Sequence, residues 1–463
     1  MASDLTGGVR GTGQAWHVRR ALLPAGWARD VRITIADGHI GQIAPETPER
    51  PGDVRIDIGI PAIGNLHSHA FQRAMAGLTE ISGSEGDSFW SWRSLMYRFV
   101  DRISPDMMEA IAAYAYIEML EAGFCHVGEF HYLHHDLDGR GYADPAEMAS
   151  RISAAATASG IGLTLLPVFY AQGGFGAQAP SDAQRRFLND PDGYARIVEG
   201  CRAATHGRPD QSVGIAPHSL RAVTPDQLAA ILPLAHGAPV HIHIAEQLRE
   251  VEDCLAWSGA RPVQWLLDNA DVDDRWCLVH ATHIDDDELA AIVRTGAVVG
   301  LCPITEANLG DGIFPASAFV RAGGRYGIGS DSNVRIDLTE ELRLLEYGQR
   351  LHARGRNMLA APGLSTGRSL LGAACEGGAR ALGVAGGLVA GASADIVTLR
   401  QDDSGFVGRA GDALLDTLIF ARGQAGIADA WRGGKRLVVD GRHIGRDAIE
   451  ARYRQALTEL LAQ

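Results

Sequence analysis

Short apolar runs and amphipathic stretches alternate along the chain between residues 61 and 382. Apolar runs bounded by turn residues are typical of buried parallel strands, and apolar residues at three- and four-residue spacing are typical of helices. Eight runs of the strand kind occur, with helix-like stretches between them. The candidate strands are residues 62–66, 124–129, 162–169, 213–216, 240–244, 277–280, 297–302 and 326–329.

Helix-start signals support this interpretation. Ser104 and Pro105 offer an N-cap and a first-turn proline before apolar residues at helical spacing, and Gly123 follows that stretch. Thr224 and Gln227 form a capping-box pattern directly after the fourth candidate strand. Eight strand and helix units predict a (β/α)8 barrel of the TIM type, because the alternative, a doubly wound sheet, usually has fewer strands.

The two ends of the chain have a different pattern, with short strands and tight turns. Residues 32–36 and 39–43 read as a hairpin near the N-terminus, and residues 394–399 and 430–439 resemble it near the C-terminus. We therefore expect a small β-sandwich domain assembled from both termini, beside an α/β barrel. The predicted division is 1–61 and 383–463 for the small domain and 62–382 for the barrel.

Composition narrows the classes of partner. The 463 residues are 46% hydrophobic and 21% charged, as in ordinary globular proteins. A formal net charge of -14 disfavours nucleic acid and anionic membranes, so neither is an expected partner. Lys435 is the only lysine in the sequence. An anionic substrate would therefore need arginines placed close to it.

Cysteine usage and the absence of long apolar segments indicate an intracellular environment. The six cysteines are scattered and form no C-x-x-C pair, which is typical of reduced thiols. The sequence begins with no basic region followed by an apolar stretch, and no run of about 18 apolar residues occurs. The expected location is the cytoplasm.

Histidines and one aspartate stand at the C-terminal ends of several candidate strands, where barrels of this type gather their active sites. His67 and His69 share one face of the first strand because side chains alternate along a strand. His243 ends the fifth strand, and Asp331 follows the eighth. A single histidine is more often a hydrogen-bonded core residue, but convergence at one mouth favours a metal site. These four ligands suit Zn²⁺ or another first-row divalent ion and leave room for water.

Two more polar residues at the same mouth are candidates for proton transfer. Glu246 lies three residues after His243, and His280 ends the sixth strand. With Asp331 they form the predicted catalytic group, in which Glu246 and His280 handle protons. The remaining nearby histidines are interpreted as structural or are given no role: His131, His134, His135, His241 and His283.

In these features the sequence resembles the amidohydrolase superfamily, whose members hold metal with a first-strand H-x-H, later histidines and an eighth-strand aspartate. The resemblance covers nearly the whole chain, including the small β-sandwich. Many members bridge two metals through a carboxylated lysine on the fourth strand, but residues 213–218 contain no lysine. The resemblance therefore implies one divalent ion per chain, with zinc expected. The pattern from His243 to Glu246 matches the H-x-x-E of its deaminases.

A finer resemblance concerns residues 65–77, which read NLHSHAFQRAMAG and are similar to the signature of the formimidoylglutamate deiminase family. Residues 130–132 (FHY) and 218–221 (HSLR) are also similar to that family. The resemblance implies hydrolysis of N-formimino-L-glutamate to N-formyl-L-glutamate and ammonia in histidine degradation.

Such a substrate is a small dicarboxylate, and its recognition requires fixed cations. Arg221 after the fourth strand and Arg93 in the long loop after the first are the expected carboxylate partners, because guanidinium binds carboxylate through two parallel hydrogen bonds. Gln72, Tyr132 and His218 are expected to add hydrogen bonds.

Two rival interpretations stay open at this stage. The first is a deaminase acting on a purine, a pterin or a related ring, but paired arginines favour an acidic substrate instead. The second is a binding scaffold that has lost its metal, which the intact ligand set disfavours. Relatives are often homodimers, so a homodimer is expected.

Overall fold

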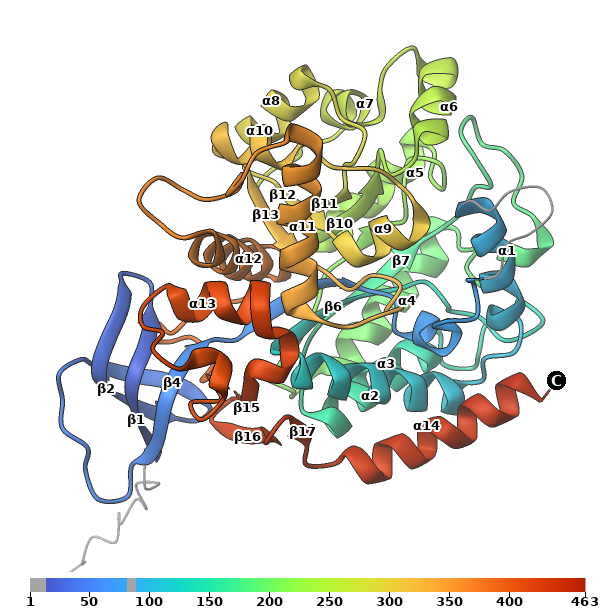
Figure 1. The fold of residues 1–463 in the computed structure, drawn as a ribbon. Coiled ribbons are helices and arrows are strands. Elements are labelled where there is room, and N and C mark those ends of the chain that lie inside the picture. The colour runs from blue at the N-terminus through green and yellow to red at the C-terminus, as the bar shows by residue number, and fades with distance from the viewer. Residues whose placement is uncertain (1–13, 81–88, 463) are drawn as a thin grey trace, which may run out of the picture.

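The computed structural model describes residues 14–80 and 89–462 (Figure 1). Parallel strands surrounded by helices form one part of this structure, and a separate sheet built from both ends of the chain forms the other. This is the α/β architecture that the alternating apolar runs predict. The division at residues 61/62 and 382/383 stays a prediction.

The eight predicted barrel strands are present, and all their hydrogen-bonded pairs are parallel. Almost all of their residues are buried, as expected for strands covered on both faces. They are β5 (Ile63–Ser68), β6 (Phe124–His131), β7 (Gly162–Phe169), β8 (Gln211–Val213) with β9 (Ala216–Pro217), β10 (Val240–Ile244), β11 (Trp276–His280), β12 (Val298–Leu301) and β13 (Arg325–Ile328).

Two isolated parallel bridges join these strands into a ring. Ile215 pairs with Val240, which links the segment between β8 and β9 to β10. Ser68 pairs with Asp331, which links the end of β5 to the segment after β13. The C-terminal strand ends therefore meet at one mouth, as the prediction of the site requires.

The predicted helix starts are confirmed. Ser104 caps α2 by accepting a hydrogen bond from the Met107 N–H at 3.3 Å, and Thr224 and Gln227 form the capping box of α5. The helices are α1 (Phe89–Val100), α2 (Pro105–Glu121), α3 (Glu147–Ser159), α4 (Pro191–Thr205), α5 (Pro225–Ile231), α6 (Leu248–Ser258), α7 (Pro262–Asn269), α8 (Asp286–Thr295), α9 (Pro303–Leu309), α10 (Ala316–Arg321), α11 (Leu338–Ala353), α12 (Thr366–Leu382), α13 (Ala413–Thr417) and α14 (Arg446–Leu461).

Both termini contribute to the smaller sheet, in the order β17-β16-β15-β14-β4-β1-β2-β3. Its own core includes Trp16 and Trp431, whose rings pack edge to face with their centroids 5.7 Å apart. Its strands are β1 (Gln14–Leu23), β2 (Gly26–Ala36), β3 (His39–Ala44), β4 (Val54–Pro61), β14 (Ile396–Leu399), β15 (Ile427–Arg432), β16 (Lys435–Val439) and β17 (Arg442–His443). One hydrogen-bonded path joins all eight strands, so the expected terminal β domain is a continuous sheet.

The C-terminal helix α14 leaves this sheet and runs along α2 on the outside of the barrel (Figure 1). The rings of Tyr114 and Tyr453 stack between the two helices, with their centroids 4.1 Å apart. Arg446 pairs with Glu121 at the same contact. The end of the chain therefore braces the barrel helix that follows the first strand.

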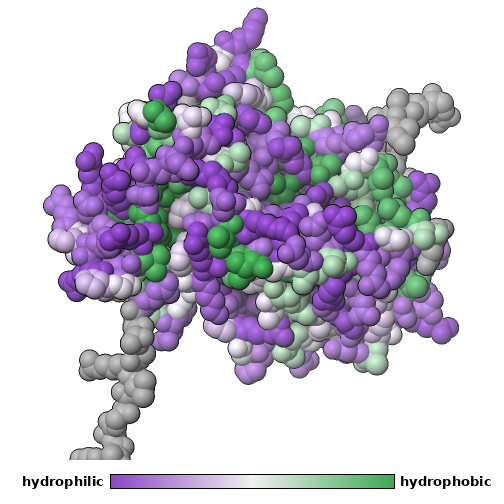
Figure 2. Space-filling model, turned by 60° about the horizontal axis from the view of Figure 1, so that its bottom comes forward, coloured by the Kyte–Doolittle hydropathy of each residue, from purple (hydrophilic) through white to green (hydrophobic). Residues whose placement is uncertain are grey.

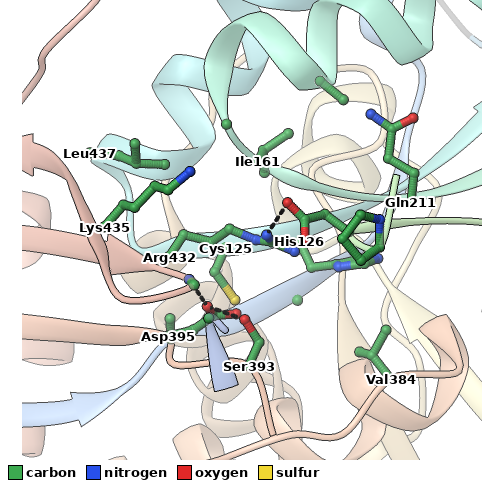
Figure 3. Close-up of a pocket in the computed structure, with 18 of the residues that line it drawn as sticks. Cys125, His126, Ile161, Gln211, Val384, Ser393, Asp395, Arg432, Lys435 and Leu437 are labelled. Atoms are coloured by element: carbon green, nitrogen blue, oxygen red, sulfur yellow. Dashed lines mark hydrogen bonds and ion pairs between the residues drawn. The ribbon is translucent and has the colours of Figure 1, made fainter. Parts of the chain in front are cut away.

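A cavity of about 1210 Å³ lies between the N-terminal ends of the first barrel strands and the small sheet (Figure 3). Cys125 and His126 line it from the start of β6, and Arg432 and Lys435 line it from the small sheet. Arg432 Nη1 lies 2.8 Å from Asp210 Oδ2 across this junction. The cavity is at the opposite end of the strands from the predicted site.

The face shown in Figure 2 is mainly hydrophilic, with hydrophobic residues in separate patches. In the part of the chain that the structure describes, no helix combines the length and apolar character needed to cross a membrane.

Candidate active site

The four predicted metal ligands come together at the mouth of the barrel. His67 Nε2 lies 3.2 Å from His69 Nε2 and 3.0 Å from His243 Nε2. Asp331 Oδ1 lies 3.2 Å from His69 Nε2. All four side chains are buried, and one ligand atom from each falls in a group with mutual distances within 4.8 Å. Three imidazoles and one carboxylate in this arrangement can hold a divalent cation.

Backbone carbonyls orient two of the imidazoles. His69 Nδ1 lies 2.9 Å from the Phe130 carbonyl oxygen, and His243 Nδ1 lies 3.0 Å from that of His218. Because a carbonyl oxygen only accepts hydrogen bonds, each Nδ1 carries the proton and each Nε2 keeps its lone pair. This is the tautomer that a metal-binding histidine requires.

The protonation states of these groups also suit a metal. Burial lowers the pKa of His67 to about 3, and it lowers the pKa values of His69 and His243 as well. Burial alone would raise the pKa of Asp331, but its hydrogen bond to His67 and the nearby imidazoles lower it well below its ordinary value. Neutral imidazoles and an ionised carboxylate are the ligand forms of these side chains.

Left-handed backbone conformations cluster around the same mouth. The φ angles of Ala245, His280, Ala281, Asp331 and Asn333 lie between 44° and 69°. Such conformations cost on the order of 1–3 kcal/mol each when strained, and they gather at functional sites. These left-handed residues lie at or directly after the strand ends that carry His243, His280 and Asp331.

A polar network holds the first and eighth strands together below these turns. The Asn65 side-chain amide donates to Ser330 Oγ at 2.6 Å, and Asn65 Oδ1 accepts from the Ser330 N–H at 3.0 Å. Ser330 Oγ in turn donates to Asn333 Oδ1, and the Asn333 amide donates to Ser68 Oγ. The network fixes the distance between the first-strand histidines and Asp331.

The predicted proton-transfer residues lie beside the ligand group. His280 Nε2 is 3.9 Å from Glu246 Oε1 and 3.8 Å from Asp331 Oδ2. Burial raises the pKa of Glu246 to about 7, against the lowering effect of His280 and Arg221. Burial would lower the pKa of His280, but the surrounding carboxylates raise it to about 10. A buried carboxyl with a pKa near 7 can give and take a proton at neutral pH.

Four of the five predicted substrate-binding residues line one pocket with these groups: Gln72, Tyr132, His218 and Arg221. The Gln72 amide donates to Tyr132 Oη at 2.9 Å. Gln72 Oε1 and Arg221 Nε are buried and have no hydrogen-bond partner among residues 14–80 and 89–462. Buried polar atoms without partners are costly, so these two are suited to meeting a ligand. The predicted loop position of Arg93 is wrong, because residue 93 belongs to helix α1. Its side chain lies outside the described residues, so its predicted role stays a prediction.

The sequence of the barrel matches a known family. Residues 58–439 match the amidohydrolase family, and residues 14–57 match the N-terminal domain of formimidoylglutamate deiminase HutF. The chain belongs to the amidohydrolase family. The predicted family resemblance is confirmed, and with it the (β/α)8 barrel type of fold.

Individual relatives of this amidohydrolase agree over nearly its full length. A formimidoylglutamate deiminase of Pseudomonas aeruginosa is 54% identical, over 96% of this chain and 99% of that protein. The crystal structure of an amidohydrolase from Brucella melitensis is 54% identical with a TM-score of 0.94, covering 97% of this chain and 100% of that chain. An adenosine deaminase from Xanthomonas campestris with bound zinc has a TM-score of 0.79 over 97% of this chain and 99% of that chain; at 23% identity it shares the fold alone.

Several other histidines of this amidohydrolase contact backbone oxygens and lie outside the ligand group, consistent with structural roles. His134 Nε2 lies 2.9 Å from the Val168 carbonyl oxygen, and His241 Nε2 lies 2.7 Å from that of Ala381. His135 and His283 make similar contacts, and His131 is buried beside His134.

Buried carboxyl groups next to the ligands were missed by sequence reasoning. Glu129 accepts a hydrogen bond from the Ala70 N–H at 2.7 Å, and burial raises its pKa to about 8. Glu250 accepts from the Ala245 and Glu246 N–H groups at 3.2 and 3.1 Å. Glu129 does end the second predicted strand, so the strand-end rule could have found it. Glu250 follows within the next helix and gives no such signal.

Proposed function

We propose that this amidohydrolase hydrolyses N-formimino-L-glutamate to N-formyl-L-glutamate and ammonia, a reaction of histidine degradation. The observation that carries the proposal is the 54% identity over 96% of the chain with a formimidoylglutamate deiminase. The match of residues 14–57 to the N-terminal domain of formimidoylglutamate deiminase HutF supports it independently of the barrel motif.

We further propose that His67, His69, His243 and Asp331 hold a single Zn²⁺ ion. The convergence of their ligand atoms within 4.8 Å and the lone pairs on the Nε2 atoms of His69 and His243 suit this ion. When bound, the ion supplies Lewis-acid activation of water at neutral pH. Its charge would also oppose a second positive charge on His280, which favours a neutral imidazole there.

The residues around the reacting carbon divide the proton transfers. His280 and Asp331 orient the attacking water and accept its proton as the oxygen bonds to the formimino carbon. Glu246 protonates the terminal nitrogen as the double bond between that carbon and the nitrogen opens. The proton taken from water then passes to the same nitrogen, the carbon–nitrogen single bond breaks, and ammonia leaves. The hydroxyl proton returns to Glu246 as the formyl carbonyl forms. The pKa of about 7 at Glu246 supports this role.

The substrate carboxylates would be bound by arginine. Arg221 Nε is buried without a partner among the described residues, and Arg221 lines the pocket beside Gln72. Arg93 is the proposed second partner, and Tyr132 and His218 the proposed further hydrogen-bonding groups. The assignment is tested by ammonia release across a panel of N-formimino-L-glutamate, formiminoglycine and neutral purines. The first should be much the fastest substrate; a faster purine would favour the heterocycle deaminase instead.

Metal content should be close to one divalent ion per chain, because the barrel has no lysine to bridge two ions. Elemental analysis of the purified protein measures this directly. His243→Asn should lose the ion. His241→Asn should keep it, because His241 lies on the same face of β10 but nearer the N-terminal end of the strand. Two tightly bound ions would contradict the proposal. They would indicate that Asp331 also binds the second ion, together with His280 and Cys302. One ligand atom from each of these three residues lies within 4.8 Å of the other two.

The assembly expected from relatives is a homodimer, and this stays a prediction. Light scattering coupled to size-exclusion chromatography should give twice the chain mass of 49.3 kDa. The absence of a nucleic-acid partner also stays a prediction, supported by the net charge of -14.

A further inference from the structure

His280 is held between carboxylates on both sides of its ring. Its Nδ1 lies 3.2 Å from Glu306 Oε1, while its Nε2 faces Glu246 and Asp331 at 3.9 and 3.8 Å. Both His280 and Glu306 are buried, with 1% and 6% of their surfaces exposed. Solvent therefore does not compete strongly for either ring nitrogen. The three neighbouring carboxylates determine which ring nitrogen carries a proton.

The position of Glu306 is fixed locally by the start of α9. Glu306 Oε1 accepts a hydrogen bond from the Cys302 N–H at 2.9 Å, and the Glu306 N–H donates to the Cys302 carbonyl oxygen at 2.9 Å. Cys302 directly follows β12, so these reciprocal bonds tie the carboxylate to the end of a barrel strand. Glu306 Oε1, which accepts the hydrogen bond at the start of α9, is also the oxygen that lies 3.2 Å from His280 Nδ1.

We propose that Glu306 is the positioning residue of His280. A carboxylate accepts a hydrogen bond from the Nδ1–H and keeps that proton on the nitrogen, so that Nε2 is the atom that exchanges protons with the reacting water. It also fixes the plane of the ring, because the contact is made at one end of a buried imidazole. The inference rests on the proposed function, in which His280 accepts a proton.

Glu341 provides a matched control at the same helix start. Its Oε2 accepts a hydrogen bond from the Ile304 N–H at 2.8 Å, and its side chain is fully buried on α11. Like Glu306 it caps α9 with a carboxylate, but no contact joins it to His280 among the described interactions. Replacing Glu341 therefore tests the helix cap without disturbing the hold on His280.

The kinetic test compares three variants with N-formimino-L-glutamate as substrate. Glu306→Ala should lower kcat about 10- to 100-fold, the usual effect of removing a group that orients a histidine at a metal site, with little change in KM or metal content. Glu306→Gln keeps a carbonyl oxygen for both hydrogen bonds and should recover most of kcat. Glu341→Ala should lower the melting temperature but leave kcat within a few-fold. Equal losses of kcat in Glu306→Ala and Glu341→Ala would overturn the proposal.

A double-mutant cycle asks whether Glu306 acts through His280. His280→Asn should lower kcat strongly, and adding Glu306→Ala to it should cause little further loss. A full additional loss would show that Glu306 acts independently, which contradicts the positioning role. If His280→Asn were itself fully active, the role of His280 in the proposed mechanism would fail, and the reason for positioning it would fail too.

An NMR measurement separates this inference from the substrate assignment. The Nδ1–H signal of His280 in ¹⁵N-labelled, metal-loaded protein is the one lost in His280→Asn. It should persist in wild type and Glu306→Gln and should disappear or exchange rapidly in Glu306→Ala. An unchanged signal in Glu306→Ala would overturn the proposal, even if the enzyme preferred another substrate. Inactivity toward N-formimino-L-glutamate with the expected NMR result would instead contradict only the proposed function.

Discussion

Glu246→Gln should retain its metal and lose about 10²- to 10⁴-fold in kcat, the range that a positioned general acid or base contributes. Glu246 is outside the four-ligand group, so its substitution should not release the ion. The amide of glutamine has no acidic proton to give to the leaving nitrogen. Steady-state kinetics on N-formimino-L-glutamate together with elemental analysis measure both parts of this result.

An exposed glutamate on the next helix gives the control. Glu252→Gln removes the same charge from the surface of α6 and should leave kcat and metal content at wild-type values. Loss of metal in Glu246→Gln would instead place Glu246 among the ligands. Retention of full kcat would remove it from the proton-transfer scheme.

Arg221→Lys should reduce kcat/KM by roughly thirtyfold to several-thousandfold. Truncating one partner of a desolvated charge pair typically costs about 2 to 5 kcal/mol, and each 1.36 kcal/mol is a factor of ten. Lysine offers a point charge and lacks the Nε donor that is buried and unpartnered among the described residues. The substituted enzyme should keep its metal, because Arg221 is not a ligand.

The substrate panel makes this result specific. Arg221→Lys should reduce the preference for N-formimino-L-glutamate over formiminoglycine, which lacks the side-chain carboxylate. The conservative control Arg294→Lys on the surface of α8 should change neither kcat/KM nor the preference between the two substrates. A silent Arg221→Lys would contradict carboxylate binding by this residue while leaving the metal site intact.

The barrel strands could be predicted because burial on both faces makes them continuous apolar runs. β7 and β10 have the predicted bounds. The fourth strand differs, because Gly214 donates to Leu165 in β7 and Ile215 donates to Pro239 before β10. This change of partner divides it into β8 and β9. Hydrogen bonding between distant segments decides that detail, and periodicity does not report it.

The metal ligands could be predicted for a similar reason, since the strand-end rule applies to any parallel barrel. His67, His243 and Asp331 are far apart in the sequence, but each lies within three residues of the C-terminal end of a barrel strand. Glu306 could not be found in this way. It lies in the first turn of α9, where a glutamate is usually a solvent-facing helix residue. Its hydrogen bond with the Cys302 N–H, directly after β12, holds its carboxylate within 3.2 Å of His280 Nδ1, and helical periodicity does not report that contact.

Lys435, the single lysine, lies beside the cavity at the N-terminal ends of the barrel strands, and this position is useful for attaching the enzyme to a solid surface. Apart from the α-amino group, Lys435 is the one amine in the sequence, and its side chain is exposed. It borders the cavity at the N-terminal ends of the strands (Figure 3), whereas the ligand group lies at their C-terminal ends. Molecules coupled to a bead or electrode through Lys435 would therefore have the mouth of the barrel directed toward the solution.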